Sequence, residues 1–212
     1  MTPAGAFNGC SRRSRLPGCA LALAIALQLL LPGTAAAALS FSTTPNSPNL
    51  PVLTLNGQSQ TDNATMANWA VTSTGSSNAW NVTVAGDSTT GHSAVFKQYC
   101  PNTTCGTDSG PGYITGGRAL AASSLTLNST GASWTGVAGT KPSHLCNSGC
   151  LIDVATAVKV ASASASVSIG TWSTTGYSTS SLSLAVPTTT RFLSQSGEVY
   201  RVDLVWTLNS GP

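Results

Sequence analysis

The feature that most constrains this sequence is an alternation of apolar and polar side chains near its C-terminus. Apolar side chains recur at every second position there: Tyr200, Val202, Leu204, Trp206 and Leu208. Successive side chains of a β-strand point to opposite faces, so a period of two predicts one strand with a continuous apolar face. The same period recurs along most of the chain, and we therefore expect a fold built from strands.

Shorter alternating stretches are separated by clusters of Gly, Ser, Asn and Pro, which are typical of turns. The apolar positions that share a face are Leu53 with Leu55, Trp69 with Val71, Trp80 with Val82 and Val84, Leu125 with Leu127, Val158 with Val160, and Leu182 with Leu184 and Val186. The Ala-rich stretch 153–166 alternates too, so we interpret it as strand rather than helix. Many short strands predict an antiparallel β-sandwich, Ig-like or jelly-roll-like, with no helix longer than about three turns.

The N-terminal segment has the three-part pattern of a secretory signal peptide. Arg12, Arg13 and Arg15 precede the apolar run ALALAIALQLLL at 20–31, and small residues at 35–38 suit cleavage. Such a run is too short to span a hydrocarbon core, which takes about 20 residues. We predict a signal peptide over 1–38, a secreted protein, and a single domain over 39–212. Arg12-Arg13 leaves the export route open between the general secretory and twin-arginine pathways.

The charge distribution argues against a nucleic-acid partner. The formal net charge is +3, but beyond the first fifteen residues the chain carries six basic and six acidic side chains. Nucleic-acid binders present a basic patch, which a neutral body does not predict. Ser and Thr account for 59 of the 212 residues, so we expect neutral hydroxyl groups to dominate the surface.

Four cysteines follow the predicted leader: Cys100, Cys105, Cys146 and Cys150. An even number of cysteines in a secreted chain indicates disulfides. Of the three possible connectivities we predict the two local pairs, Cys100–Cys105 and Cys146–Cys150, because each pair brackets a turn-rich stretch. We expect the segments that contain them, 87–118 and 131–152, to be loop excursions from the sandwich. A zinc site built from His144 and some of these thiols is the alternative, although no Cys-x-x-Cys spacing supports it.

Residues that could support catalysis are few. The segment 91–95 (GHSAV) matches the nucleophile elbow Gly-x-Ser-x-Gly only in part, and a Ser93–His144 pair is the catalytic alternative that it offers. Glu198 and Asp203 lie five positions apart on the predicted strand, so they should face opposite sides and cannot converge on one bond. We therefore expect a non-catalytic protein with no cofactor and no metal.

Two Trp-x-aliphatic motifs are more informative, Trp80-Asn81-Val82 and Trp206-Thr207-Leu208. The spacing places each Trp and its aliphatic partner on one face of a strand. Either both pairs belong to the core, since burying a Trp removes a large apolar area from water, or they form an exposed strip that stacks on sugar rings. We favour the core interpretation, and we expect Trp206 to be buried.

The sequence around these motifs resembles the WxL-domain family of secreted bacterial cell-surface proteins. The segments that carry the resemblance are 69–84 (WAVTSTGSSNAWNVTV) and 198–212 (EVYRVDLVWTLNSGP). Val82 stands where the family usually has Leu, and the two cysteine pairs resemble the actinobacterial relatives. The resemblance implies a non-catalytic domain that binds peptidoglycan or a wall-attached polymer non-covalently. It also implies that Trp80, Val82, Trp206 and Leu208 are the ligand-binding candidates.

Three functions follow from these observations. The first is a secreted protein that associates with the cell wall, the second a structural or adhesive subunit that assembles with other surface proteins, and the third a secreted hydrolase. No sorting signal or apolar tail follows Pro212, so we expect any surface retention to be non-covalent and the mature chain to lack a membrane span. Asn63, Asn81, Asn102 and Asn128 begin Asn-x-Ser/Thr triplets, which matter only in a host that glycosylates asparagine.

Overall fold

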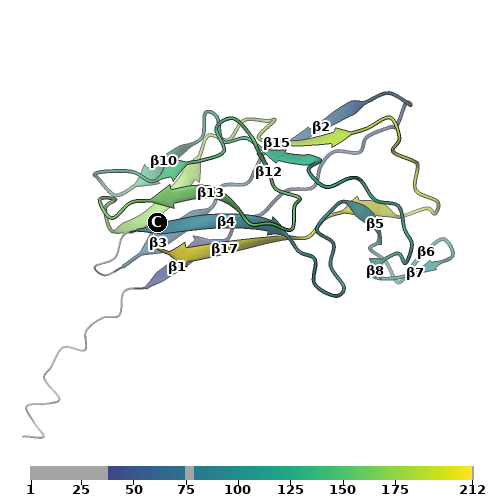
Figure 1. The fold of residues 1–212 in the computed structure, drawn as a ribbon, viewed down its shortest axis with the longest axis horizontal. Coiled ribbons are helices and arrows are strands. Elements are labelled where there is room, and N and C mark those ends of the chain that lie inside the picture. The colour runs from purple at the N-terminus through teal and green to yellow at the C-terminus, as the bar shows by residue number, and fades with distance from the viewer. Residues whose placement is uncertain (1–37, 75–78, 212) are drawn as a thin grey trace, which may run out of the picture. The chain divides into compact units, whose positions relative to one another are not determined.

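The structure is a computed structural model that describes residues 38–74 and 79–211. Every regular element in these ranges is a strand, and every strand pairing is antiparallel (Figure 1). The all-β class and the antiparallel sheets are thus confirmed. Among the described residues no helix has the length and apolar character needed to cross a membrane. The predicted leader lies outside the described residues except for Ala38.

The strands are short and follow one another closely along the chain. They are β1 (Leu39–Thr43), β2 (Gln60–Ala64), β3 (Ala70–Ser73), β4 (Trp80–Gly86), β5 (Lys97–Cys100), β6 (Thr104–Cys105), β7 (Asp108–Ser109), β8 (Gly112–Tyr113), β9 (Leu125–Leu127), β10 (Ser133–Gly136), β11 (Ser143–His144), β12 (Cys150–Leu151), β13 (Val158–Ala163), β14 (Gly170–Thr175), β15 (Leu182–Val186), β16 (Val199–Arg201) and β17 (Leu204–Ser210).

Two four-stranded sheets form the sandwich, with strand orders β1-β3-β14-β10 and β11-β13-β4-β17. Their inner faces meet in a core of buried indole rings. The ring of Trp134 on β10 lies edge-on to that of Trp80 on β4, with centroids 5.8 Å apart. It also lies edge-on to Trp69, just before β3, at 5.0 Å. Edge-to-face packing of this kind suits the aromatic quadrupole, so this cluster joins the two layers.

A third four-stranded sheet, in the order β12-β9-β15-β2, extends the same core. Its inward side chains are the alternating leucines of β9 and β15 and a valine at the end of β15: Leu125, Leu127, Leu182, Leu184 and Val186. These are positions that the sequence predicts on common strand faces. The Ala-rich stretch 153–166 contains β13 and no helix, in agreement with its alternation.

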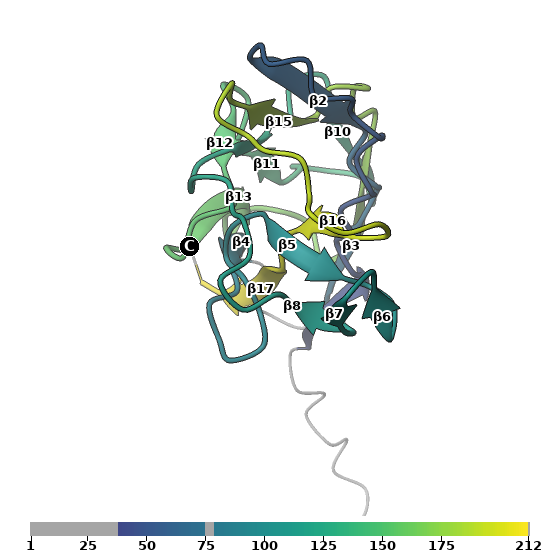
Figure 2. The ribbon, with the colours of Figure 1, turned by 90° about the vertical axis from the view of Figure 1, so that its right-hand side faces the viewer.

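Both predicted disulfides are present. Cys100–Cys105 bridges β5 and β6, and Cys146–Cys150 closes the turn before β12. The segment 87–118 leaves the sandwich as expected. It contributes β5 and β8 to a sheet with β16 and forms the hairpin β6-β7, and these strands face the viewer in Figure 2. The segment 131–152 is more integrated than we expected, because it contributes β10, β11 and β12 to three different sheets.

Two strand predictions are wrong. The C-terminal strand is not continuous: β16 ends at Arg201, and β17 begins at Leu204 in another sheet. The backbone of Asp203 between them bonds to Ser93 and Asp87 instead of a neighbouring strand. No strand contains Leu53 and Leu55, which lie in an irregular segment where the Gln60 side chain donates to the Thr54 carbonyl (3.0 Å).

Candidate functional site

The two Trp-x-aliphatic motifs lie on neighbouring strands, although they are far apart in sequence. In the β4–β17 pairing, Val84 stands opposite Trp206, Val82 opposite Leu208, and Trp80 opposite Ser210. Directly opposed residues of an antiparallel pair share a face, so both motifs belong to one apolar row on the inner face of the sheet. The sequence predicts each motif but not their pairing.

Burial divides this row in two. Trp80 and Val82, on the inner strand β4, are completely buried. Trp80 and Val82 are therefore core residues, as the core interpretation of the motifs predicts, because they present no surface to a ligand in this structure. Trp206 and Leu208 are only half-buried, since β17 is the edge strand of its sheet. Our expectation that Trp206 is buried is thus only partly met: its ring lies 6.4 Å from that of Trp69 and keeps part of its surface exposed.

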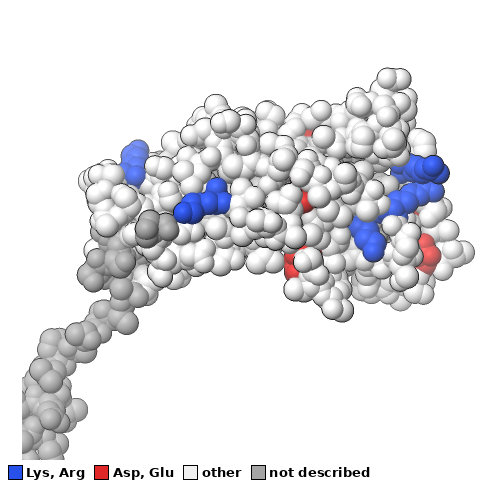
Figure 3. All heavy atoms as spheres, in the orientation of Figure 1, with Lys and Arg blue, Asp and Glu red and all other residues white. Residues whose placement is uncertain are grey.

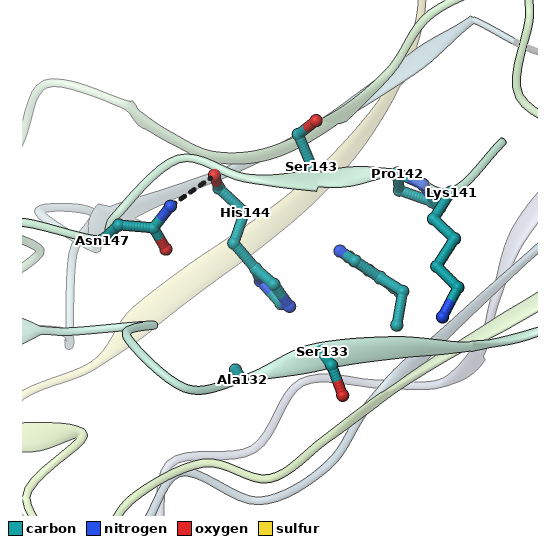
Figure 4. A pocket seen from close by; sticks show the side chains of 8 residues that line it. Ala132, Ser133, Lys141, Pro142, Ser143, His144 and Asn147 are labelled. Atoms are coloured by element: carbon teal, nitrogen blue, oxygen red, sulfur yellow. Dashed lines mark hydrogen bonds between the residues drawn. The ribbon is translucent and has the colours of Figure 1, made fainter.

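A surface depression of about 380 Å³ lies on the opposite edge of the sandwich, between β10 and β11. Its lining is formed by Ala132, Ser133, Trp134, Lys141, Pro142, Ser143, His144 and Asn147. In Figure 4 the side chains of His144 and Lys141 point into the space between the two strands, whereas the Ser133 and Ser143 hydroxyls point away. The depression is therefore lined by the ammonium group of Lys141 and by the aromatic rings of Trp134 and His144.

The imidazole of His144 is the unusual group in this depression. It stacks on the indole of Trp134 at 4.9 Å, and it lies edge-on to Tyr177 at 6.0 Å. Desolvation by this aromatic environment lowers the pKa of His144, and a hydrogen bond involving the Ser133 backbone opposes that shift. Trp134 Nε1 and His144 Nε2 are shielded from solvent without hydrogen-bond partners. His144 is therefore held as a neutral packing group at neutral pH.

Asp203 is the centre of a second polar cluster, at the joint between β16 and β17. Its carboxylate accepts hydrogen bonds from the Tyr113 hydroxyl (2.8 Å) and from Arg201 Nε (2.9 Å). His92 Nδ1 lies 3.2 Å from the same carboxylate and 3.4 Å from that of Asp87. Burial is the main cause that raises the pKa of Tyr113, and the Asp203 carboxylate raises it further. This cluster fastens the 87–95 loop to β8 and β17, which is a structural role.

The catalytic and metal alternatives gain no geometric support. The Ser93 hydroxyl donates to the Val95 carbonyl (2.7 Å), while the His144 ring packs against Trp134 and Tyr177. The zinc alternative draws on His144 and some of the four cysteines, and all four cysteines are joined in disulfides. Among the residues that the structure describes, no three His, Cys, Asp or Glu side chains are arranged to hold a metal ion.

The prediction that Glu198 and Asp203 face opposite sides of one strand needs correction. Glu198 precedes β16 and Asp203 follows it, so the two lie outside the strands. Glu198 accepts hydrogen bonds from Gln98 Nε2 (2.8 Å) and from the Gln195 backbone (3.0 Å), whereas Asp203 belongs to the cluster with Tyr113. Of the Asn-x-Ser/Thr triplets, the one at Asn81 begins with a buried side chain.

Comparisons with protein-family models, with curated proteins and with solved structures found no match to this chain. The resemblance to WxL domains, and what it implies about ligand and location, stays a prediction.

Proposed function

We propose that this chain is a secreted, non-catalytic protein that associates non-covalently with the bacterial cell wall through peptidoglycan or a wall-attached polymer. The observation that supports this most directly is the pairing of its two Trp-x-aliphatic motifs on β4 and β17. The motif on β4 is buried in the core, whereas the motif on the edge strand β17 leaves the Trp206 ring half-exposed. A partly exposed indole offers an apolar face for stacking on a sugar ring.

Two further properties fit this proposal. Both disulfides suggest an oxidising environment outside the cytoplasm. The face drawn in Figure 3 carries few charged side chains, as expected for a surface rich in neutral hydroxyls. Such a surface resists changes of salt and pH, which titrate or screen carboxylates and ammonium groups.

Co-sedimentation tests the proposal. The secreted protein is mixed with purified sacculi and centrifuged, and the pellet is compared with the supernatant. We expect the protein in the pellet, with saturation as its concentration rises. A protein that stays in the supernatant at every sacculus concentration contradicts the proposal, and its co-purification with another surface protein supports the assembly alternative instead.

A variant pair separates binding by Trp206 from its packing role. Trp206→Phe keeps an apolar ring, whereas Val205→Thr changes the outward, 46% exposed neighbour on the same strand with little change in volume. Sacculus binding and the melting temperature are measured for both variants. Direct contact predicts that Trp206→Phe weakens binding at an unchanged melting temperature, while Val205→Thr binds like the parent. A lower melting temperature with full binding below the transition shows that Trp206 acts only through folding.

A further inference from the structure

A second depression, of about 280 Å³, lies next to the sheet β16-β5-β8. Three segments meet there: residues 118–121, the loop 187–191 that follows β15, and Tyr200 of β16. Arg118 and Arg191 both line it. Figure 3 shows several Lys and Arg side chains at this end, where Figure 1 labels β5, together with Asp or Glu side chains.

Neither guanidinium group forms a salt bridge with a carboxylate of the described residues. The salt bridges found among the described residues involve Arg201 and His92, and neither Arg118 nor Arg191 lies within 4.0 Å of an acidic oxygen. Glu198 is near enough to Arg118 for an electrostatic interaction, but it accepts hydrogen bonds from Gln98 and Gln195 instead. Both arginines can therefore donate to a ligand.

Hydrogen bonds hold the loop that presents Arg191. The Tyr200 hydroxyl donates to the Arg191 carbonyl (2.9 Å), and the Thr190 amide donates to the Pro187 carbonyl (2.9 Å). The Thr190 hydroxyl oxygen, in the same lining, is shielded from solvent and has no hydrogen-bond partner. A fixed loop lowers the entropic cost of binding, and an unpartnered hydroxyl is costly until it is satisfied.

An exposed aromatic residue follows the lining residue Arg191 directly in the chain. Phe192 is 66% exposed and is the one aromatic side chain among the exposed large hydrophobic residues that the structure describes. An exposed ring next in the chain to a cationic donor suits a ligand that has both apolar sugar faces and acidic groups. These features together select a carbohydrate chain rather than a small inorganic anion.

We propose that the depression between Arg118 and Arg191 binds a carboxylate or phosphate group of an acidic polysaccharide, with Phe192 against a neighbouring sugar ring. The fork of a guanidinium matches the two oxygens of either group, which gives short charge-assisted hydrogen bonds. The inference deepens the proposed function, on which it rests, by naming acidic polymers as the class of wall ligand.

Binding to soluble polymers tests this site. The full chain is secreted from a host that forms disulfides, purified, and titrated with polygalacturonate, a phosphomannan and neutral dextran. We expect binding to at least one acidic polymer, weakening with added salt, and none to dextran. The polymer that binds identifies carboxylate or phosphate as the group recognised. Equal binding to dextran, or equal binding to double-stranded DNA, overturns the proposal.

Substitutions locate the binding. Arg118→Gln and Arg191→Gln should each weaken binding of the acidic polymer roughly tenfold or more, as expected for the loss of a charge-assisted hydrogen bond. Phe192→Ala should weaken it too. Lys159→Gln removes the same charge from an exposed position on β13 and is the matched control. Unchanged binding by the double arginine variant, at an unchanged melting temperature, overturns the proposal.

The same variants distinguish this inference from the proposed function. If the wild-type chain and the double arginine variant sediment equally with sacculi and bind polygalacturonate equally, the wall association stands and the arginine site is wrong. If the wild-type chain binds an acidic polymer through these arginines but never sediments with sacculi, the site stands and the wall association is wrong.

Discussion

The imidazole of His144 lies almost parallel to the indole of Trp134, with ring centroids 4.9 Å apart and planes inclined by 17°. His144 belongs to β11 and Trp134 to β10, which are edge strands of the two facing sheets. Their stack therefore closes one side of the sandwich. On the other side the edge strands β1 and β17 lie close together, next to the half-buried Trp206.

This stack predicts a loss of stability in mild acid. The pKa of His144 is lowered in the folded state, mainly by desolvation, relative to an ordinary value of 6.5. Well above pH 6.5 the side chain is neutral in both states, and the full stability is present. As the pH falls below this value the unfolded chain takes up the proton first, so the free energy of unfolding decreases. Urea unfolding between pH 7.5 and 5.5 measures the effect.

His144→Phe is the matched variant for this prediction, since it retains a ring against Trp134 but cannot be protonated. His92 stays in both proteins, so the difference between their pH profiles reports His144 alone. We expect a shallower pH dependence in the variant over this range. Identical profiles would mean that protonation of His144 is not coupled to folding.

The two motif tryptophans should differ in their effect on stability. Trp80→Ala empties a fully buried site and should cost about 3–5 kcal/mol, the usual range for a large aromatic side chain in a core. Trp206→Ala should cost clearly less, below about 3 kcal/mol, because part of the ring is already in water. Denaturant unfolding monitored by circular dichroism compares them. Equal costs would show that the edge position is as tightly packed as the core.

Asp203→Asn should destabilise the chain by about 2 kcal/mol, because it weakens charge-assisted hydrogen bonds from Arg201 and Tyr113. Asp87→Asn is the comparison: among the described residues its carboxylate accepts hydrogen bonds only from Thr89, two residues along the same loop, so we expect a smaller shift of the unfolding midpoint than for Asp203→Asn. The prediction fails if the two variants unfold at the same denaturant concentration.

The two disulfides should contribute unequally to stability. Each closes a loop of only a few residues, so the entropic gain is about 2 kcal/mol for either bridge. Cys146 also packs in the main hydrophobic core, whereas Cys100 and Cys105 belong to the 87–118 segment. Replacing Cys146 and Cys150 by Ala should therefore lower the melting temperature more than replacing Cys100 and Cys105. The reverse order would contradict this assignment.

Local periodicity predicts several of the strands that contribute to the core, but not β10 and β14, which supply the buried Trp134 and Trp172. Leu125, Leu127, Leu182 and Leu184 lie where the alternation places them, on inner faces of paired strands. The period failed at Val202 and Asp203, where the chain passes from one sheet to another without losing its alternation. It failed again at Leu53 and Leu55, which pack partly against the core from an irregular segment. An alternating sequence does not show whether a partner strand is present.

The candidate sites depend on contacts that no local pattern encodes. The sequence contains both Trp-x-aliphatic motifs, but their register, with Leu208 opposite Val82, arises only from the pairing of β4 with β17. Arg118 and Arg191 come together because segments far apart in sequence meet beside Tyr200. The neutral charge balance of the chain beyond its first fifteen residues conceals the proximity of these two arginines.

The most direct test of wall association is a binding isotherm on sacculi that have first been stripped of attached proteins by protease. The account predicts saturable binding that survives the protease treatment and disappears when the glycan strands are digested with a muramidase. Binding that is lost with the attached proteins and does not depend on intact glycan would contradict it, and would show that the chain assembles with a surface protein.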